Sequence, residues 1–175
     1  MLPSYLGKSL ACAILTFTAF TLAANKDKSQ PAPRFNAKTM EGEKFDNAGI
    51  KGQVVLLEFW TTWCHFCAEE APLVEKLSQE FRDQGLTVLA VNVGESKKTV
   101  KKYLEQHPRT CRIVLTEDTN LAAMYQATVY PVYVVIDREG NIVTTQRGAG
   151  GERALRHSLS RAGMGSADAA DDSDE

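Results

Sequence analysis

A continuous apolar run that carries a single acid constrains the fold of this chain more than any other feature. Residues 54–60 read Val-Val-Leu-Leu-Glu-Phe-Trp, which is typical of a strand buried on both faces beneath helices. Cys64 and Cys67 follow it closely, and the apolar spacing from Leu73 to Phe81 predicts a helix after them. A buried strand that leads into a helix is the basic unit of α/β folds.

The rest of the pattern continues this alternation. A hairpin is predicted around Glu41-Gly42, and Pro72, which lacks an N–H donor, is expected to kink the first helix. Further strands are predicted at 86–93, 113–115, 132–136 and 141–145, and further helices at 97–107, 120–125 and 152–162. This order predicts an α/β fold with parallel and antiparallel strands in one sheet.

The two ends of the chain differ from its middle. Residues 1–24 predict an export signal, because Lys8 and the amino terminus precede an apolar run that ends in small residues. That run is shorter than the roughly 17–25 residues of a membrane span, but an uncleaved amino-terminal membrane anchor remains an alternative. Residues 25–32 are predicted as a polar linker, 33–163 as the folded domain and 164–175 as an acidic disordered tail.

Charge and cysteine count narrow the function classes. The net charge of −2 implies neither a nucleic acid nor a membrane surface as partner, and we expect a monomer. Loss of the signal would remove Cys12 and leave three cysteines, which cannot all pair within one molecule. The close pair is therefore interpreted as chemical rather than structural, and Cys111 as a small buried hydrophobic residue.

The Cys-x-x-Cys pair between a strand and a helix favours redox chemistry. At a helix start the first sulfur lies near the positive end of the helix dipole, which favours the thiolate that attacks disulfides. We therefore predict Cys64 as the nucleophile and Cys67 as the resolving cysteine. Zinc would require four ligands and usually a second pair, whereas copper binding by both cysteines and His65 remains open.

Several segments resemble known proteins. The segment from Glu58 to Cys67, Pro72 and the loop Val129-Tyr130-Pro131-Val132 resemble the active-site segment, helix proline and cis-proline loop of thioredoxins. Three further segments resemble more narrowly the TlpA/ResA-like branch of exported thioredoxins; they are residues 31–35, 90–97 and 137–140. The resemblance covers about residues 31–163.

This resemblance implies a thioredoxin-like three-layer α/β sandwich. Its mixed central sheet would carry an amino-terminal β-hairpin and an inserted helix and strand at about 96–115. The implied function is thiol–disulfide exchange in the periplasm or at the outer face of the cytoplasmic membrane. We expect a reductase of exported proteins, with cytochrome c maturation as a candidate pathway, a membrane electron donor upstream and no cofactor beyond the cysteine disulfide. The alternatives are a copper metallochaperone and a thiol peroxidase, the latter because Thr61 stands three residues before Cys64.

The resemblance also implies roles for two acids. Glu58 would assist proton transfer to Cys67, unless its side chain reaches a sheet edge or pairs with a cation. Glu70 lies one helical turn after Cys67, where the branch places an acid beside the active site, and its alternative is an exposed helix carboxylate.

Five further residues are expected to contact the substrate. Trp63, His65 and Phe66 surround the cysteines in sequence, whereas Trp60 is expected in the core. By resemblance Pro131 is a cis proline that faces the cysteines, and the backbone of Tyr130 pairs with a substrate strand.

Overall fold

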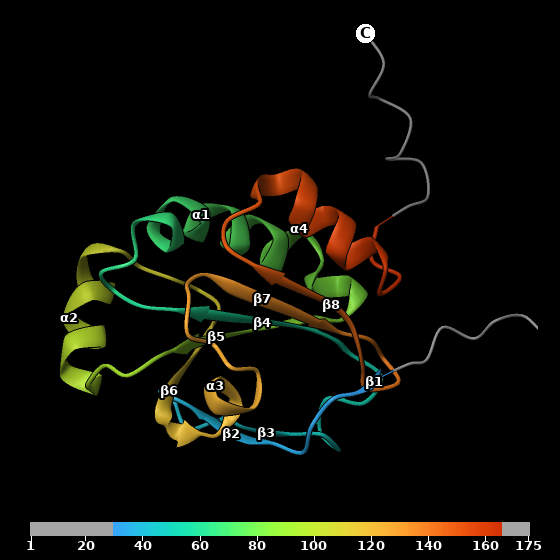
Figure 1. Ribbon diagram of the computed structural model, residues 1–175, viewed down its shortest axis with the longest axis horizontal. Coiled ribbons are helices and arrows are strands. Elements are labelled where there is room, and N and C mark those ends of the chain that lie inside the picture. Colours follow the sequence, from blue (N-terminus) through green and yellow to red (C-terminus); the bar gives the residue numbers. More distant parts are fainter. Residues whose placement is uncertain (1–29, 166–175) are drawn as a thin grey trace, which may run out of the picture.

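The computed structural model describes residues 30–165 (Figure 1). The predicted export signal, residues 25–29 of the predicted linker and the tail from residue 166 lie outside the described residues. The strands are β1 (Gln30–Pro31), β2 (Asn36–Thr39), β3 (Lys44–Asp46), β4 (Val54–Trp60), β5 (Leu86–Asn92), β6 (Arg112–Thr119), β7 (Val132–Ile136) and β8 (Asn141–Arg147). The helices are α1 (His65–Glu80), the 3-10 helix η1 (Arg82–Gln84), α2 (Lys97–Gln106), α3 (Leu121–Met124) and α4 (Gly151–Ser160).

All of these strands form one mixed sheet in the order β1-β8-β7-β4-β5-β6-β2-β3. β4, β5 and β6 are parallel neighbours, and β7 joins β4 antiparallel on the other side. Every residue of β4 and β5 is buried. This agrees with the apolar run at 54–60, because central strands of a helix-covered sheet meet no solvent on either face.

Helices cover both faces of the sheet. Val74 and Leu77 of α1, Leu155 of α4 and Val100 of α2 pack on one face, against the even-numbered side chains of β4. Leu121 of α3 and the amino-terminal segment pack on the other face. Figure 1 shows α1 and α4 above the sheet and α3 below it. The predicted three-layer α/β sandwich with a hairpin and an inserted helix and strand is confirmed.

Two differences from the prediction concern how strands pair. β6 continues to Thr119, beyond the predicted 113–115, because its polar half pairs with β2 of the hairpin. Residues 30–31, assigned to the linker, form β1 and pair with the start of β8. Of the helices in residues 30–165, none is long and apolar enough to cross a membrane.

Different segments of the chain lie at the two ends of the sheet. The parallel strands β4 and β5 end side by side, because Trp60 is paired with Asn92. The loops that follow them, 61–64 and 93–96, therefore meet at one end of the sheet. β1 lies at the opposite end, where β8 begins and where β7 ends opposite Val55.

Candidate active site

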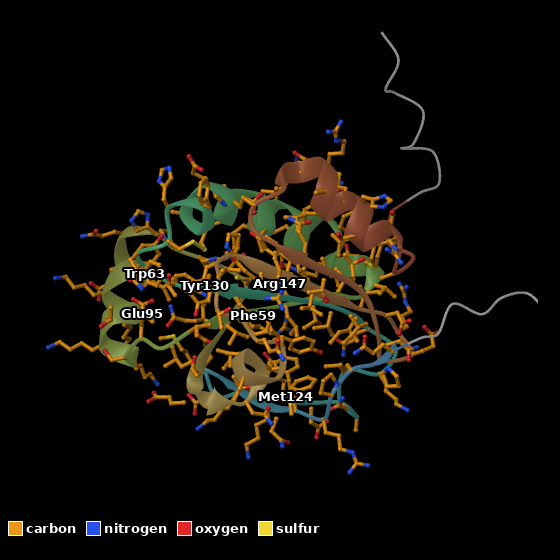
Figure 2. All side chains as sticks on the ribbon, in the orientation of Figure 1. Phe59, Trp63, Glu95, Met124, Tyr130 and Arg147 are labelled. Carbon is orange, nitrogen blue, oxygen red and sulfur yellow. A yellow bond between two sulfur atoms is a disulfide. The ribbon has the colours of Figure 1, made fainter. Side chains whose placement is uncertain are left out.

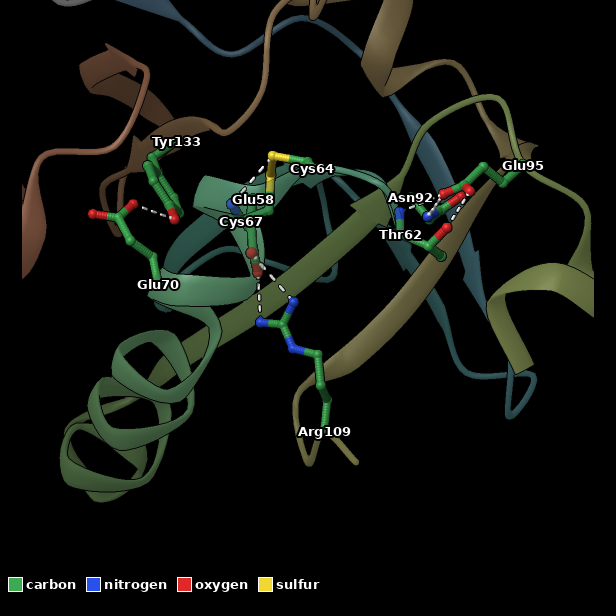
Figure 3. The surroundings of a disulfide bond; sticks show 9 residues. All are labelled: Glu58, Thr62, Cys64, Cys67, Glu70, Asn92, Glu95, Arg109 and Tyr133. Atoms are coloured by element: carbon green, nitrogen blue, oxygen red, sulfur yellow. Dashed lines mark hydrogen bonds and ion pairs between the residues drawn. A yellow bond between two sulfur atoms is a disulfide. The ribbon is translucent and has the colours of Figure 1, made fainter. Parts of the chain in front are cut away.

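The two cysteines lie at the first turn of α1 and form a disulfide (Figure 3). Cys64 is the N-cap residue, and its Sγ accepts a hydrogen bond from the Cys67 N–H at 3.1 Å. Both residues are buried, with Cα atoms 5.3 Å apart. A sulfur that receives a helix N–H at the positive end of the dipole is one on which negative charge is stabilised. The predicted meeting of the two sulfurs at a helix start is confirmed.

An exposed apolar rim surrounds the buried sulfurs. Trp63 and Phe66 are 70% and 56% exposed, and Val129 is also exposed. The Tyr130 ring meets the Trp63 ring edge-on at a centroid distance of 5.7 Å, and Figure 2 shows the two side chains together. His65 is exposed, with Nε2 3.1 Å from a carboxylate oxygen of Glu69. The rim brings together residues expected to contact the substrate, and that role stays a prediction.

The loop before β7 has the predicted geometry. The Tyr130–Pro131 peptide bond is cis. The Tyr130 hydroxyl donates to the Ala127 carbonyl at 3.1 Å, and the Gly148 N–H donates to the Pro131 carbonyl at 2.8 Å. Hydrogen bonds therefore hold the loop that carries Tyr130 on both sides. The contact between the Tyr130 and Trp63 rings joins it to the cysteine loop.

Glu58 is fully buried and forms an ion pair, which was the alternative to a free proton carrier. Arg109 donates from Nη2 to Glu58 Oε2 at 2.6 Å and from Nη1 to Oε1 at 3.2 Å, and its side chain is 3% exposed. Burial is the largest influence on Arg109 and opposes its charge, but the attraction of Glu58, its hydrogen bonds and the contributions of Cys111 and Glu75 together outweigh burial and raise the pKa of the guanidinium. The guanidinium also lies 5.5 Å from the centre of the Trp60 ring, in the core as predicted.

Glu75 of α1 holds the segment that supplies Arg109. Its carboxylate accepts hydrogen bonds from Arg109 Nε at 3.3 Å, from the Thr110 N–H at 2.7 Å, from the Thr110 hydroxyl and from the Cys111 N–H at 3.3 Å. Burial opposes its ionisation, but hydrogen bonds from Cys111 and Thr110 lower the pKa of Glu75 overall. Cys111 is buried and free, as predicted, and burial above all raises the pKa of its thiol.

A pocket of about 330 Å³ opens between α1 and the end of α2. Cys67 lines it together with Pro72, Tyr103, His107 and Arg109. The resolving cysteine and the cation that binds Glu58 therefore border the same space.

Glu70 is 6% exposed, so its alternative as an exposed helix carboxylate is wrong. Its Oε2 accepts a hydrogen bond from the Tyr133 hydroxyl at 2.8 Å, and its Oε1 accepts from the N–H groups of Gly150 and Gly151 at 2.9 and 2.6 Å. A carboxylate at the start of α4 matches the positive end of that helix. Glu70 therefore connects α1 with β7 and α4.

The arginine that pairs with Glu58 was not predicted from the sequence, nor were the acids that hold the neighbouring loops by hydrogen bonds. Arg109, Glu75 and Tyr133 were not singled out, although an acid within a buried strand demands a partner. Glu95 was noted only within a resembling segment, yet it contacts the cysteine loop (Figure 3). The signal for it was available, because the carboxyl ends of neighbouring parallel strands meet at one end of a sheet.

Two observations concern the alternative chemistries. Among residues 30–165, no group of three or more histidine, cysteine, aspartate or glutamate side chains could hold a metal ion. In the same part of the chain the Thr61 hydroxyl is buried without a hydrogen-bond partner, so it makes no hydrogen bond to the Cys64 sulfur.

A disulfide at the head of a sheet-covering helix, beside a cis-proline loop, defines the class of thiol–disulfide oxidoreductases. The comparisons with known proteins agree. The model of the AhpC/TSA family matches residues 29–145, and the chain belongs to this family. Its thioredoxin-like fold and its ResA-like character, both predicted, are confirmed by the relatives described next.

Two curated relatives and two solved structures illustrate the relationship. The thioredoxin-like protein YneN of Bacillus subtilis is 34% identical over 152 residues, which cover 81% of this chain and 88% of the relative. The thiol-disulfide oxidoreductase ResA of Bacillus cereus is 28% identical over 138 residues, covering 77% and 80%. The crystal structure of StoA from Bacillus subtilis matches with a TM-score of 0.62 and 26% identity, covering 75% of this chain and 98% of StoA. The thioredoxin domain of a thiol-disulfide oxidoreductase from Bacteroides vulgatus matches with a TM-score of 0.62 and 25% identity, covering 74% and 95%.

Proposed function

We propose that this thiol–disulfide oxidoreductase works outside the cytoplasm as a reductase of disulfides in exported proteins. One observation carries the redox part: the Cys64 sulfur is the N-cap of α1 and is bonded to the Cys67 sulfur. The export signal predicted from residues 1–24 supports the compartment. No cofactor beyond this disulfide is required, and the working unit is a monomer.

The reaction balances with the two cysteines alone. The Cys64 thiolate attacks one sulfur of a substrate disulfide, a mixed disulfide forms, and the other substrate sulfur leaves as a thiolate that takes up a proton. Cys67 then loses its proton and attacks the Cys64 sulfur. The Cys64–Cys67 bond forms, the mixed disulfide breaks, and the second substrate sulfur leaves and is protonated. Two electrons and two protons reach the substrate, so a dithiol donor must reduce the pair again, and we place that donor in the membrane.

Glu58 is the better placed of the two acids to handle the Cys67 proton. A carboxylate offers about four lone-pair sites. Arg109 occupies one on each oxygen of Glu58, whereas Glu70 Oε1 already accepts two backbone N–H groups. Arg109 and Cys67 both line the 330 Å³ pocket, through which solvent can exchange the proton. We therefore assign proton transfer to Glu58, because its ion pair with Arg109 leaves a lone-pair site free on each carboxylate oxygen, and the positioning of α1 against α4 to Glu70.

The apolar rim provides the docking surface for an unfolded substrate. Trp63, Phe66 and Tyr130 present aromatic area beside the buried sulfurs, with His65 exposed at the edge. An extended substrate strand would lie along the Tyr130–Pro131 loop. A disulfide-bonded apocytochrome c segment is the candidate substrate, and cytochrome c maturation the candidate pathway.

The test is turbidimetric reduction of insulin, followed by reduction of an oxidised Cys-x-x-Cys-His peptide, with all variants in a Cys12→Ser background. We expect Cys64→Ser to abolish both activities, Cys67→Ser to accumulate mixed disulfides, and the matched control Cys111→Ser to retain activity. Equal activity of Cys64→Ser and its parent would overturn the assignment.

A second measurement decides the direction of electron flow. The reduction potential of the Cys64–Cys67 couple should lie below about −200 mV, in the range of reducing thioredoxins, whereas a value near about −120 mV would mark an oxidant. Peroxide consumption that survives Cys67→Ser, or stoichiometric copper uptake without exchange, would instead support one of the two alternatives.

A further inference from the structure

Glu95 connects the two loops that follow the central parallel strands. Its Oε2 accepts hydrogen bonds from the Thr62 N–H and from Asn92 Nδ2, each at 2.7 Å, and its Oε1 accepts from the Thr62 hydroxyl at 2.5 Å. The Val93 N–H donates to the Trp60 carbonyl at 3.0 Å in the same place. Figure 3 shows Glu95, Asn92 and Thr62 as one cluster, on the side of the disulfide opposite to Glu70.

We propose that Glu95 is a positioning residue for disulfide exchange, which holds the 61–64 loop so that the Cys64 sulfur stays in the N-cap position of α1. This inference rests on the proposed exchange reaction and assigns it a residue outside the cysteine pair. Thr62 stands two residues before Cys64, and Glu95 takes both its N–H and its hydroxyl. The link therefore restrains the backbone as well as a side chain.

The surroundings of Glu95 fit this role. Asn92 is fully buried at the end of β5 and directs one amide donor at the Glu95 carboxylate. Hydrogen bonds to an ionised acceptor are shorter and stronger than neutral ones, so the cluster ties the loop to a rigid strand. Within the loop itself, the Cys64 N–H donates to the Thr61 carbonyl at a longer distance, 3.3 Å.

The cluster depends on the two oxygens of Glu95. All three groups that point at Glu95 donate to these oxygens. A glutamine could keep the cluster, because its one oxygen can accept from Thr62 N–H and Asn92 while its NH₂ group donates to the Thr62 hydroxyl, which can also accept. Glu95→Met keeps roughly the length of the side chain, removes both oxygens and breaks the cluster.

The loop geometry matters because exchange depends on the position and charge of one sulfur. The Cys64 Sγ receives the Cys67 N–H, and Trp63 packs on Tyr130 at the other side of the loop. A displacement of about 1 Å at a reacting group can cost about a hundredfold in rate. Release of Thr62 should therefore slow attack by Cys64 and weaken stabilisation of its thiolate.

The experiment compares four variants in the Cys12→Ser full chain. Glu95→Met removes both acceptor oxygens, Thr62→Val removes the hydroxyl and keeps the charge of Glu95, and Thr62→Ser is the conservative rescue. Glu105→Met is the matched control, because Glu105 is exposed on α2 and outside the cluster. Insulin reduction gives kcat and KM, and the pH profile of Cys64 alkylation by iodoacetamide reports the thiolate without any substrate.

We expect Glu95→Met to lower kcat/KM about ten- to a hundredfold, Thr62→Val to lower it less, and Thr62→Ser to recover most of the loss. The alkylation midpoint of Cys64 should move to higher pH in Thr62→Val, where the charge of Glu95 is intact and only geometry has changed. Parent-like kcat/KM and alkylation profiles in folded Glu95→Met and Thr62→Val would overturn the inference, even if both melt at lower temperature. Because alkylation needs no substrate, an inactive parent would refute the proposed reductase separately.

Discussion

Substitution of Arg109 should lower the free energy of unfolding, because it leaves a buried charge without its partner beneath the active site. Arg109→Met keeps most of the apolar stem but leaves the Glu58 carboxylate, which is 0% exposed, without either of its two guanidinium hydrogen bonds. Breaking a buried ion pair from one side typically costs about 3–5 kcal/mol. For a domain of this size such a loss lowers the melting temperature by about 10–20 °C.

A second substitution, Glu58→Gln, tests this reasoning, because its effect on the free energy of unfolding should change sign between the two backgrounds. Glu58→Gln should destabilise the parent, because it removes the charge that faces Arg109. The same substitution should stabilise Arg109→Met, because it removes the buried charge that has lost its partner. The free energies of unfolding come from urea titrations of the parent, both single variants and the double variant, with equal m-values as the condition for comparison.

One result would refute this account. If Glu58→Gln destabilises the Arg109→Met variant as much as it destabilises the parent, the two side chains are not energetically coupled. The loss in Arg109→Met would then come from other contacts, such as the guanidinium over Trp60 at 5.5 Å.

Three further outcomes follow from the neighbouring groups. Glu75→Gln should lower the free energy of unfolding by about 1–3 kcal/mol at neutral pH. Because the pKa of Glu75 is lowered in the folded state, this loss is complete above the unfolded value of 4.5 and disappears as pH falls through the folded value. Urea titrations between pH 7 and pH 3 measure it. In the reduced, folded protein the Cys111 thiol should react with Ellman's reagent far more slowly than in urea, since burial raises its pKa; equal rates would contradict its burial. Tyr133→Phe should lower the free energy of unfolding by about 1–2 kcal/mol, because Glu70 Oε2 loses its donor. The same substitution in a Glu70→Gln background should cost less if that hydrogen bond is responsible.

The fold was predictable where apolar periodicity is strong and local. The run at 54–60 and the spacing from Leu73 to Phe81 place β4 and α1, because burial on both faces or on one stripe leaves a direct trace in the sequence. The polar end of β6 leaves no such trace. Its residues become a strand because β2 offers backbone partners from far back in the sequence, such as Ala37 for Thr119.

The site was predictable to the same degree. The spacing of Cys64 and Cys67 and their place between strand and helix identify the redox pair, and resemblance supplies the cis bond before Pro131. The partners of the acids come from distant segments. Arg109 lies 51 positions from Glu58, and Gly150 lies 80 positions from Glu70, so only the folded chain shows which carboxylate is engaged by which donor.

The pairing of β1 with the start of β8 determines where the domain can be attached. Gln30 enters the sheet opposite Ile142, at the end remote from the disulfide, and Gly165 leaves beside Gln84, just ahead of β5 and near the same end. A tether to a membrane, or an affinity tag at either boundary, would thus hold the molecule by its base and direct the sulfurs outward. Immobilised forms of the protein should therefore keep the end that carries the disulfide accessible to large protein substrates.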